Sequence, residues 1–236
     1  MERPMMTPFR RALMWGIVFF MPAVVNAGGA GQAAVPMPAA ECRAVLKQMA
    51  QSLAVHGTLK ARFVQERRLA LFDDVLKMAG YFYYQKPGRI RWEFTEPYAS
   101  IILLLEDGRT ERFDIAGGKA VKSASEGVSI SGEVLNQISR WLNGDLEPAL
   151  KDFDVQMVRG ASYLLTLHPK SEAMSGFISR LEFEIEPRSY LVLAINLWEA
   201  GNDVTRIRFT SQSVDTRLPD RIFDSKDPRL LGESER

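Results

Sequence analysis

Most of the chain after residue 57 consists of short segments in which apolar and polar residues alternate, and turn residues separate these segments. Ile90, Trp92 and Phe94, for example, alternate with charged residues. Alternation with period 2 is typical of a strand that has one buried face. Asp107-Gly108 is a favoured tight hairpin turn. The pattern predicts a large antiparallel sheet of about ten strands. The expected strands cover residues 59–66, 75–85, 89–94, 100–106, 109–115, 153–158, 163–168, 178–185, 191–198 and 204–209.

Two stretches carry the helical period instead. The first is an apolar stripe from Cys42 to Leu53, and the second covers residues 134–142 and ends at an Asn-Gly pair. A large antiparallel sheet curls strongly, and its apolar concave face must be covered. The predicted fold class is therefore α+β and mainly β, with a large curved antiparallel sheet covered by helices.

The N-terminus has the three-part pattern of a secretory signal peptide. Arginines precede an uncharged run from Ala12 to Val25, and small residues allow cleavage after Ala27. The run is shorter than the roughly 20 residues that a membrane span needs, which disfavours the alternative of a retained anchor. We predict a signal peptide over residues 1–27, a flexible tether over 28–39, one folded domain over 40–223 and a polar tail over 224–236.

Composition argues against several classes of function. Lys and Arg number 30 and Asp and Glu number 29, so the formal net charge is +1 and nucleic-acid binding is not expected. One cysteine and two histidines make a Cys- or His-rich metal centre improbable on sequence grounds. In an exported protein a lone cysteine is buried or pairs between chains, and we expect Cys42 to be buried on the first helix.

Sequence signatures of catalysis are also lacking. The chain contains no phosphate-binding glycine loop, no Gly-x-Ser-x-Gly and no Ser-x-x-Lys. His56 and His168 each stand alone, and we expect them to be surface or satisfied polar residues. Glu182, Glu184 and Glu186 lie at alternate strand positions, which is typical of a solvated face. We predict neither enzymatic activity nor a cofactor nor a metal site.

One block of sequence resembles a known family. Ala-Arg-Phe-Val-Gln at residues 61–65 is followed by Gly-Tyr-Phe-Tyr-Tyr-Gln-Lys-Pro-Gly-Arg-Ile-Arg-Trp-Glu-Phe at 80–94, then by Pro97 and Asp107-Gly108. This order is similar to that of the outer-membrane lipoprotein carrier family, the LolA-like periplasmic lipoprotein chaperones. The resemblance extends over residues 40–223, and its Lys-Pro-Gly-Arg-Ile-Arg-Trp-Glu block is the specific part.

The resemblance implies an incomplete barrel with helices as a lid and an apolar cavity for acyl chains. It implies a periplasmic carrier of acylated lipoproteins, or of a related lipid cargo, without enzymatic activity or cofactor. Its expected partners are an inner-membrane lipoprotein-releasing transporter and an outer-membrane acceptor. We expect a monomer, because a carrier must leave one membrane to reach another.

Candidate cargo-binding residues follow from the strand parity, because every second side chain of a curved sheet points into its concavity. Ile138 and Trp141 are expected on the inner face of the helical lid. The full set of predicted acyl-chain contacts is Phe63, Tyr81, Tyr83, Ile90, Trp92, Phe94, Leu103, Leu105, Ile138 and Trp141.

Lid control is assigned by the resemblance to the basic residue before Pro87. The family usually has arginine there, whereas this chain has Lys86. Lysine keeps the charge but loses the planar fork of donors, so Arg89 or Arg91 is an alternative lid residue. Glu111 and Arg112 follow the Asp-Gly turn where the family tends to be apolar, which favours an altered cargo.

Three other functions stay open on the sequence alone. The first is a specialised paralogue that carries a lipid other than lipoprotein. The second is a lipoprotein-binding sensor or adaptor of the cell envelope, which binds cargo and signals to a partner protein. The third is an envelope enzyme whose site is assembled only in space.

Overall fold

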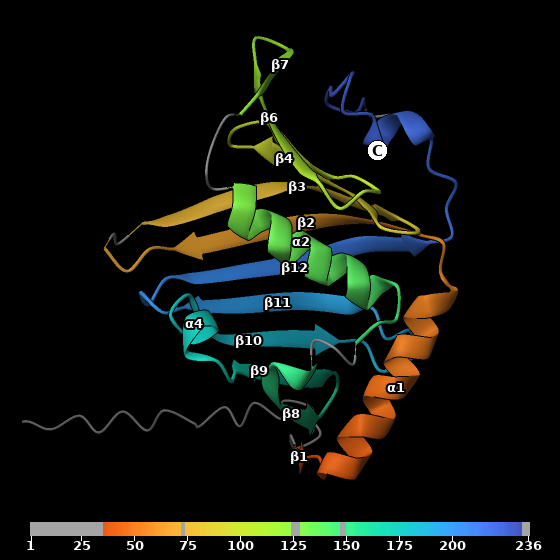
Figure 1. Ribbon diagram of the computed structural model, residues 1–236, viewed down its shortest axis with the longest axis vertical. Helices are drawn as coiled ribbons and strands as arrows, with labels where there is room; N and C mark the ends of the chain where they lie inside the picture. The colour runs from red at the N-terminus through yellow and green to blue at the C-terminus, as the bar shows by residue number, and fades with distance from the viewer. Residues whose placement is uncertain (1–34, 72–73, 124–127, 147–149, 233–236) are drawn as a thin grey trace, which may run out of the picture. The chain divides into compact units, whose positions relative to one another are not determined.

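The computed structural model describes residues 35–71, 74–123, 128–146 and 150–232. The predicted signal peptide and residues 28–34 of the predicted tether lie outside the described residues. The described strands form one twelve-stranded antiparallel sheet (Figure 1). The elements are β1 (Val35–Pro36), α1 (Ala39–Val55), β2 (Thr58–Arg68), β3 (Val75–Gln85), β4 (Arg89–Glu96), β5 (Ser100–Leu104), β6 (Thr110–Ala116), β7 (Lys119–Lys122), α2 (Val128–Leu142), β8 (Phe153–Arg159), β9 (Tyr163–Pro169), α4 (Glu172–Ser175), β10 (Ile178–Ile185), β11 (Val192–Glu199), β12 (Val204–Val214) and the 3₁₀ turn η1 (Asp220–Phe223).

The sheet consists of two meanders, in which strands adjacent in sequence are paired. Strands β2 to β7 form one meander, and β8 to β12 form the other, with β1 added beside β8. The meanders join where β12 pairs with β2, for example at Phe209 opposite Phe63. Strands β1 and β7 lie at opposite ends of the strand order, and no described pairing connects them. The sheet is therefore open, and the expectation of an incomplete barrel is confirmed.

Both predicted helices are present and cover the same face of the sheet, which we call the inner face. Helix α1 packs against β8, β9 and β10. Helix α2 crosses in front of β3, β2 and β12 (Figure 1). The apolar stripe of α1 is buried from Cys42 to Leu53, as its spacing predicted. Burial raises the pKa of the Cys42 thiol above its ordinary value.

The second helix is held by its apolar side and by its end. Leu135 is buried among inner-face residues of β2 to β5. Beyond the helix, Gly144 has a φ of +85°, which an L-residue adopts only with strain. The Asn-Gly pair read from the sequence therefore does end this helix, by the left-handed glycine that commonly follows a helix.

The opposite face of β3 to β5, which we call the outer face, has a different cover. The chain leaves β12 and returns across this face, where it buries Leu218, Ile222, Phe223 and Leu231 against Tyr83. Residues 224–232 were expected only as part of a polar tail. Leu231 is nevertheless 4% exposed, because its side chain completes this cluster.

Strands β1 and β7, helix α4 and the turn η1 were not expected from the sequence. Strands β1 and β7 are two and four residues long, too short for a period of 2 to be visible. Helix α4 is a single turn in which the Ser171 hydroxyl accepts a hydrogen bond from the Met174 amide. Strand β12 also runs further than predicted, because an irregularity between Thr210 and Ser213 interrupts its alternation.

Candidate functional site

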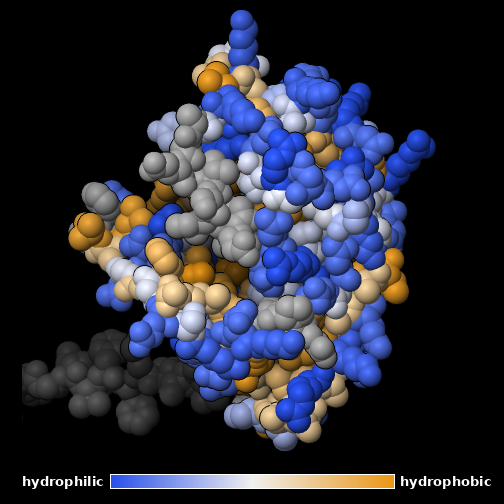
Figure 2. Space-filling model, in the orientation of Figure 1, coloured by the Kyte–Doolittle hydropathy of each residue, from blue (hydrophilic) through white to orange (hydrophobic). Residues whose placement is uncertain are grey.

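An apolar cavity lies between the inner face and the two helices, where the two meanders meet. Its volume is about 60 Å³. Figure 2 shows apolar atoms set deeper between the polar atoms that cover most of this side of the molecule. The cavity is lined by Met49, Leu53, Leu59, Ala61, Phe82, Trp92, Ile138, Trp141, Leu142, Phe183, Leu191, Val192, Ile195, Phe209 and Gln212.

The size of the cavity limits what it holds in this conformation. Sites for drug-sized ligands usually enclose about 300–1,000 Å³, and a cavity of about 150 Å³ binds benzene. The cavity of about 60 Å³ is smaller than either. A long acyl chain therefore does not fit inside the cavity in this conformation.

Aromatic rings form the sheet side of the cavity wall. The Trp92 ring lies edge-on to Phe63 and to Phe82, with centroid distances of 5.4 Å in both cases. It also stacks on Phe94 at 6.3 Å and contacts Phe209 at 6.4 Å. Each such pair contributes about 0.5–1.5 kcal/mol beyond its buried area. The rings thus form a closely packed aromatic cluster on the sheet side of the cavity.

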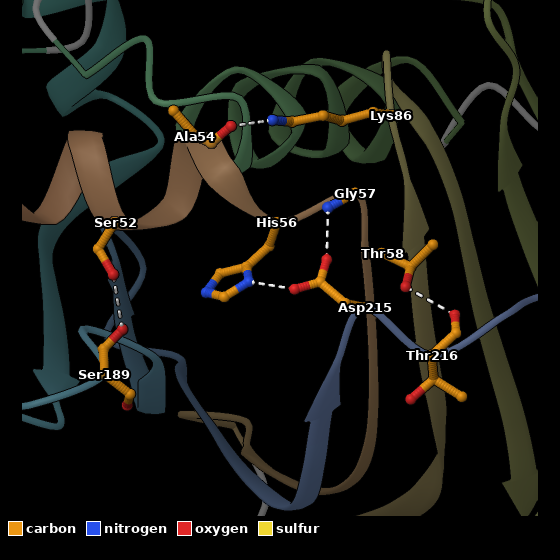
Figure 3. A network of polar contacts seen from close by, with 9 residues as sticks. All are labelled: Ser52, Ala54, His56, Gly57, Thr58, Lys86, Ser189, Asp215 and Thr216. Atoms are coloured by element: carbon orange, nitrogen blue, oxygen red, sulfur yellow. Dashed lines mark hydrogen bonds and ion pairs between the residues drawn. The ribbon is translucent and has the colours of Figure 1, made fainter.

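The C-terminal end of α1 is tied to the sheet by polar contacts (Figure 3). The Lys86 ammonium donates to the carbonyl oxygen of Ala54, one of the helix carbonyls that has no partner within the helix. Asp215 accepts hydrogen bonds from the His56 ring and from the Gly57 amide, each at 2.8 Å. These bonds hold the pKa of the Asp215 carboxyl below its ordinary value.

The C-terminal end of α2 is fixed at the same corner. The Tyr84 hydroxyl donates to the Asn143 side chain at 2.8 Å, and the Asn143 amide donates to the Pro87 carbonyl oxygen at 2.5 Å. Burial raises the pKa of the Tyr84 hydroxyl. A Cβ on Gly144 would lie 2.6 Å from the Ala50 carbonyl oxygen of α1. Both helices are thus anchored beside the β3–β4 hairpin.

Six of the ten predicted cargo contacts lie on the inner side of the sheet or on the helical cover. Trp92, Ile138 and Trp141 line the cavity itself. Phe63, Ile90 and Phe94 belong to the surrounding apolar cluster. Whether these residues contact cargo stays a prediction.

The other four predicted contacts are on the outer face, so their placement was wrong. Tyr81 and Tyr83 pack under the C-terminal segment, while Leu103 and Leu105 belong to a separate outer cluster. The reason is the register, because a shift of one residue moves a whole strand's side chains to the other face.

The β3–β4 hairpin pairs Gln85 with Arg89, so Tyr84 and not Tyr83 lies opposite Ile90. Likewise Leu104 pairs with Ile90 across β4 and β5. The missed inner residues are therefore Phe82, Tyr84, Ile102 and Leu104. The symmetry of a turn centred on Pro87 was the signal that could have identified the first two.

The prediction that Arg91 is a lid residue also placed it on the wrong face of the sheet. It lies on the outer face, 1% exposed, where its guanidinium pairs with the buried Glu93 carboxylate. It donates to the Ile222 carbonyl oxygen at 3.0 Å and to that of Arg229 at 2.6 Å. Arg91 therefore holds the C-terminal segment, and the expectation that it controls a lid is wrong. Lys86, in contrast, does lie beside a covering helix.

Chemically reactive arrangements are sparse in the described part of the chain. No group of three His, Cys, Asp or Glu side chains there has the geometry of a metal site.

Among the described residues, no helix is long and apolar enough to span a membrane. Glu111, one of the two charged residues noted after the Asp-Gly turn, pairs with Lys122 at 2.9 Å across β6 and β7.

Comparisons with solved structures find matches of low sequence identity. A DUF1329 family protein from Desulfovibrio piger matches with 11% identity and a TM-score of 0.46, over 78% of this chain and 97% of that one. A LolA superfamily protein from Nitrosomonas europaea matches with 10% identity and a TM-score of 0.38, over 78% and 97%. Lipoprotein LppX from Mycobacterium tuberculosis matches with 7% identity and a TM-score of 0.39, over 77% and 100%.

The sequence comparisons give a more definite result. Curated proteins yield no match to this chain. The model of the family described as "Outer membrane lipoprotein carrier protein LolA" matches residues 56–226. This stretch contains β2 to β12 and η1, and thus both meanders and helix α2. The chain belongs to the LolA outer membrane lipoprotein carrier family.

Proposed function

We propose that the protein is a carrier that binds the acyl chains of lipoproteins, or of a related lipid, between the inner face and helices α1 and α2. The apolar cavity beneath the two helices is the observation that carries this proposal. Each buried CH₂ group is stabilised by about 0.8 kcal/mol. A chain of about 16 carbons therefore gains on the order of 12 kcal/mol when it leaves water for such a site.

Cargo enters when the helices move about their anchored corner. The apolar contacts of α1 and α2 with the sheet are non-directional, whereas the contacts at Lys86, Asn143 and Asp215 are directional hydrogen bonds. The corner therefore serves as the hinge while the apolar contacts open. Lys86 controls the lid in this proposal, because it bonds the last turn of α1.

The proposed location is the periplasm, after export and cleavage behind Ala27. The charged and apolar N-terminal pattern supports export, and membership of the lipoprotein carrier family supports the route between two membranes. The proposed partners are acylated lipoproteins, an inner-membrane lipoprotein-releasing transporter and an outer-membrane acceptor. The protein acts as a monomer and without enzymatic activity.

A release assay tests the carrier function. The purified chain without its predicted signal peptide, residues 28–236, is added to spheroplasts of the source cell. We expect acylated lipoproteins in the soluble fraction, bound to the added protein. Recovery of a different lipid in its place indicates a specialised paralogue. A soluble fraction with no hydrophobic cargo of any kind contradicts the carrier function.

Two variants on β2 test whether the release of cargo depends on the cavity. Ala61 lines the cavity and is 1% exposed, whereas Val64 of the same strand is 48% exposed on the other face. Ala61→Leu fills part of the cavity, so we expect it to release severalfold less cargo than the wild-type protein. Val64→Leu is the matched control and keeps wild-type release. Equal release by both variants argues against the cavity as the binding site.

A further inference from the structure

Two tryptophans that line the apolar cavity have indole N–H groups without a hydrogen-bond acceptor. Trp92 comes from β4 on the sheet side, and Trp141 comes from α2 on the helical side. Trp92 is 7% exposed. The indole nitrogens of both residues are shielded from water and have no acceptor within hydrogen-bond distance among the described residues.

An unpartnered indole N–H is unusual in a protein interior. A buried tryptophan N–H generally finds an acceptor, because it has given up a hydrogen bond to water. Phenylalanine would supply an aromatic ring at either position without that loss. Two such donors in one cavity wall therefore indicate an acceptor that arrives with a ligand.

The other polar groups near the cavity are already engaged. Gln212 lines the wall, and its amide donates to the Val192 carbonyl oxygen at 2.9 Å. The Tyr84 hydroxyl, in the neighbouring cluster, donates to Asn143. Among the described residues that line the cavity, the two indole N–H groups are thus the buried donors without a partner.

The surroundings restrict the charge of that ligand. No charged side chain lines the cavity in the described part of the chain. A free carboxylate would be buried there without a counter-charge, which is strongly unfavourable. A saturated hydrocarbon would leave both indole donors unsatisfied. A neutral acceptor attached to an apolar chain suits both the donors and the wall.

We propose that the indole N–H groups of Trp92 and Trp141 donate to the carbonyl oxygens of ester- or amide-linked acyl chains, so that the cavity selects acylated cargo over alkyl chains without a carbonyl. This inference rests on the proposed carrier function and names the chemical group that its site recognises. Each indole N–H then gains the acceptor that it lacks in the closed cavity.

Two lipids that differ only at the linkage test the proposal. 1-Palmitoyl-lysophosphatidylcholine has an ester carbonyl, and 1-O-hexadecyl-lysophosphatidylcholine has an ether in its place. Residues 28–236 are labelled with ¹⁵N at the tryptophan indoles and titrated with each lipid below its micellar concentration. They contain 3 of the chain's 4 tryptophans, Trp92, Trp141 and Trp198, and Trp→Phe variants assign their N–H signals.

We expect the ester lipid to bind about three- to tenfold more tightly than the ether lipid, the range that one or two net hydrogen bonds provide. The Trp92 and Trp141 signals should move downfield with the ester lipid only. Trp198 is the internal control, because it lies outside the cavity lining and packs under the Arg180 guanidinium at 3.7 Å. Its signal should move little with either lipid.

Variants complete the test. Trp92→Phe and Trp141→Phe keep an apolar ring, so we expect them to bind the ether lipid normally and to lose the preference for the ester. Trp198→Phe keeps the preference. Equal binding of ester and ether lipids by the wild-type protein overturns the role of the indoles but leaves the carrier function standing. Failure of both lipids to bind overturns the carrier function and the inference together.

Discussion

The two faces of strands β3 to β5 are both covered, but by different kinds of contact. On the inner face, Trp92 and its neighbouring rings meet helices through apolar surface, with a small cavity between them. On the outer face, Arg91 and Glu93 form a buried ion pair that holds the C-terminal segment. Trp92 and Arg91 are neighbours on β4, yet Trp92 packs beneath the helices and Arg91 binds the C-terminal segment.

In the proposed carrier, this difference lets one sheet combine a movable cover with a fixed one. Apolar contacts have no required direction, so a helix that lifts loses area gradually and regains it against a lipid. The outer segment receives bonds from Arg91 to two of its carbonyl oxygens, and those bonds require one position. We expect ligand-dependent motion on the inner side and very little on the outer side.

The largest effect is expected from breaking the outer cover. Arg91→Ala removes the cation beside a buried carboxylate, which costs about 3–5 kcal/mol of unfolding free energy. Urea denaturation measures this loss. As a control, Arg109→Ala removes an ion pair with Asp107 on the surface and should leave the unfolding free energy nearly unchanged.

A double variant shows whether charge or packing is responsible. Arg91→Met combined with Glu93→Leu replaces both charges by apolar groups, so most of the lost stability should return. If the double variant is as unstable as Arg91→Ala, the bonds to the segment's carbonyl groups matter more than the ion pair.

A smaller effect is expected at the anchored corner of the inner cover. Gly144→Ala adds a Cβ within 2.6 Å of the Ala50 carbonyl oxygen at a φ of +85°. We expect a loss of about 1–3 kcal/mol, together with faster exchange of bound lipid, because α2 is displaced from α1. Thermal unfolding and lipid-transfer kinetics measure these two effects.

Gly118→Ala is the control for backbone strain alone. Gly118 has a φ of +77°, but a Cβ there would have no atom within 4 Å. It should lose less stability than Gly144→Ala and leave lipid exchange unchanged. Equal losses for the two variants would show that the clash of the new Cβ with the Ala50 carbonyl oxygen does not contribute to the loss of stability.

The smallest expected effect is a dependence on pH at the end of α1. The pKa of Asp215 is lowered by its bonds to His56 and Gly57, so its contribution is present above the ordinary carboxyl pKa and is lost as pH falls through the lowered value. Asp215→Asn should therefore be less stable than the wild-type protein near neutral pH. The difference should shrink between about pH 5 and pH 2 when urea denaturation is repeated at each pH. A difference that stays constant over this range would show that the carboxylate charge is irrelevant.

The sequence predicted the helices and strands better than it predicted the register between strands and the packing of distant segments. Period 2 and period 3.6 are local properties, so the long strands and both predicted helices could be located. Register depends on the geometry of each turn, and Tyr81 and Tyr83 were assigned to the wrong face for that reason. The outer cover could not be foreseen, because Arg91 and the Arg229 carbonyl are separated by 138 residues.

The cavity lining shows the same division. Trp92, Ile138 and Trp141 were identified because they lie in the recognisable block and on an amphipathic helix. Phe183 and Ile195 were not, because they belong to the second meander. Among the described strands, only the pairing of β12 with β2 joins that meander to the first, and no local pattern encodes the pairing.

That pairing also has a consequence for the order in which the molecule folds. Each meander can form from hairpins between neighbouring strands, but β12 and β2 are separated by well over a hundred residues. Contacts of such long sequence separation form slowly, because a large loop must close first. The cavity has walls from both meanders, so it comes into existence only at this late step. A lipid that binds there distinguishes the completed fold from any intermediate with one finished meander.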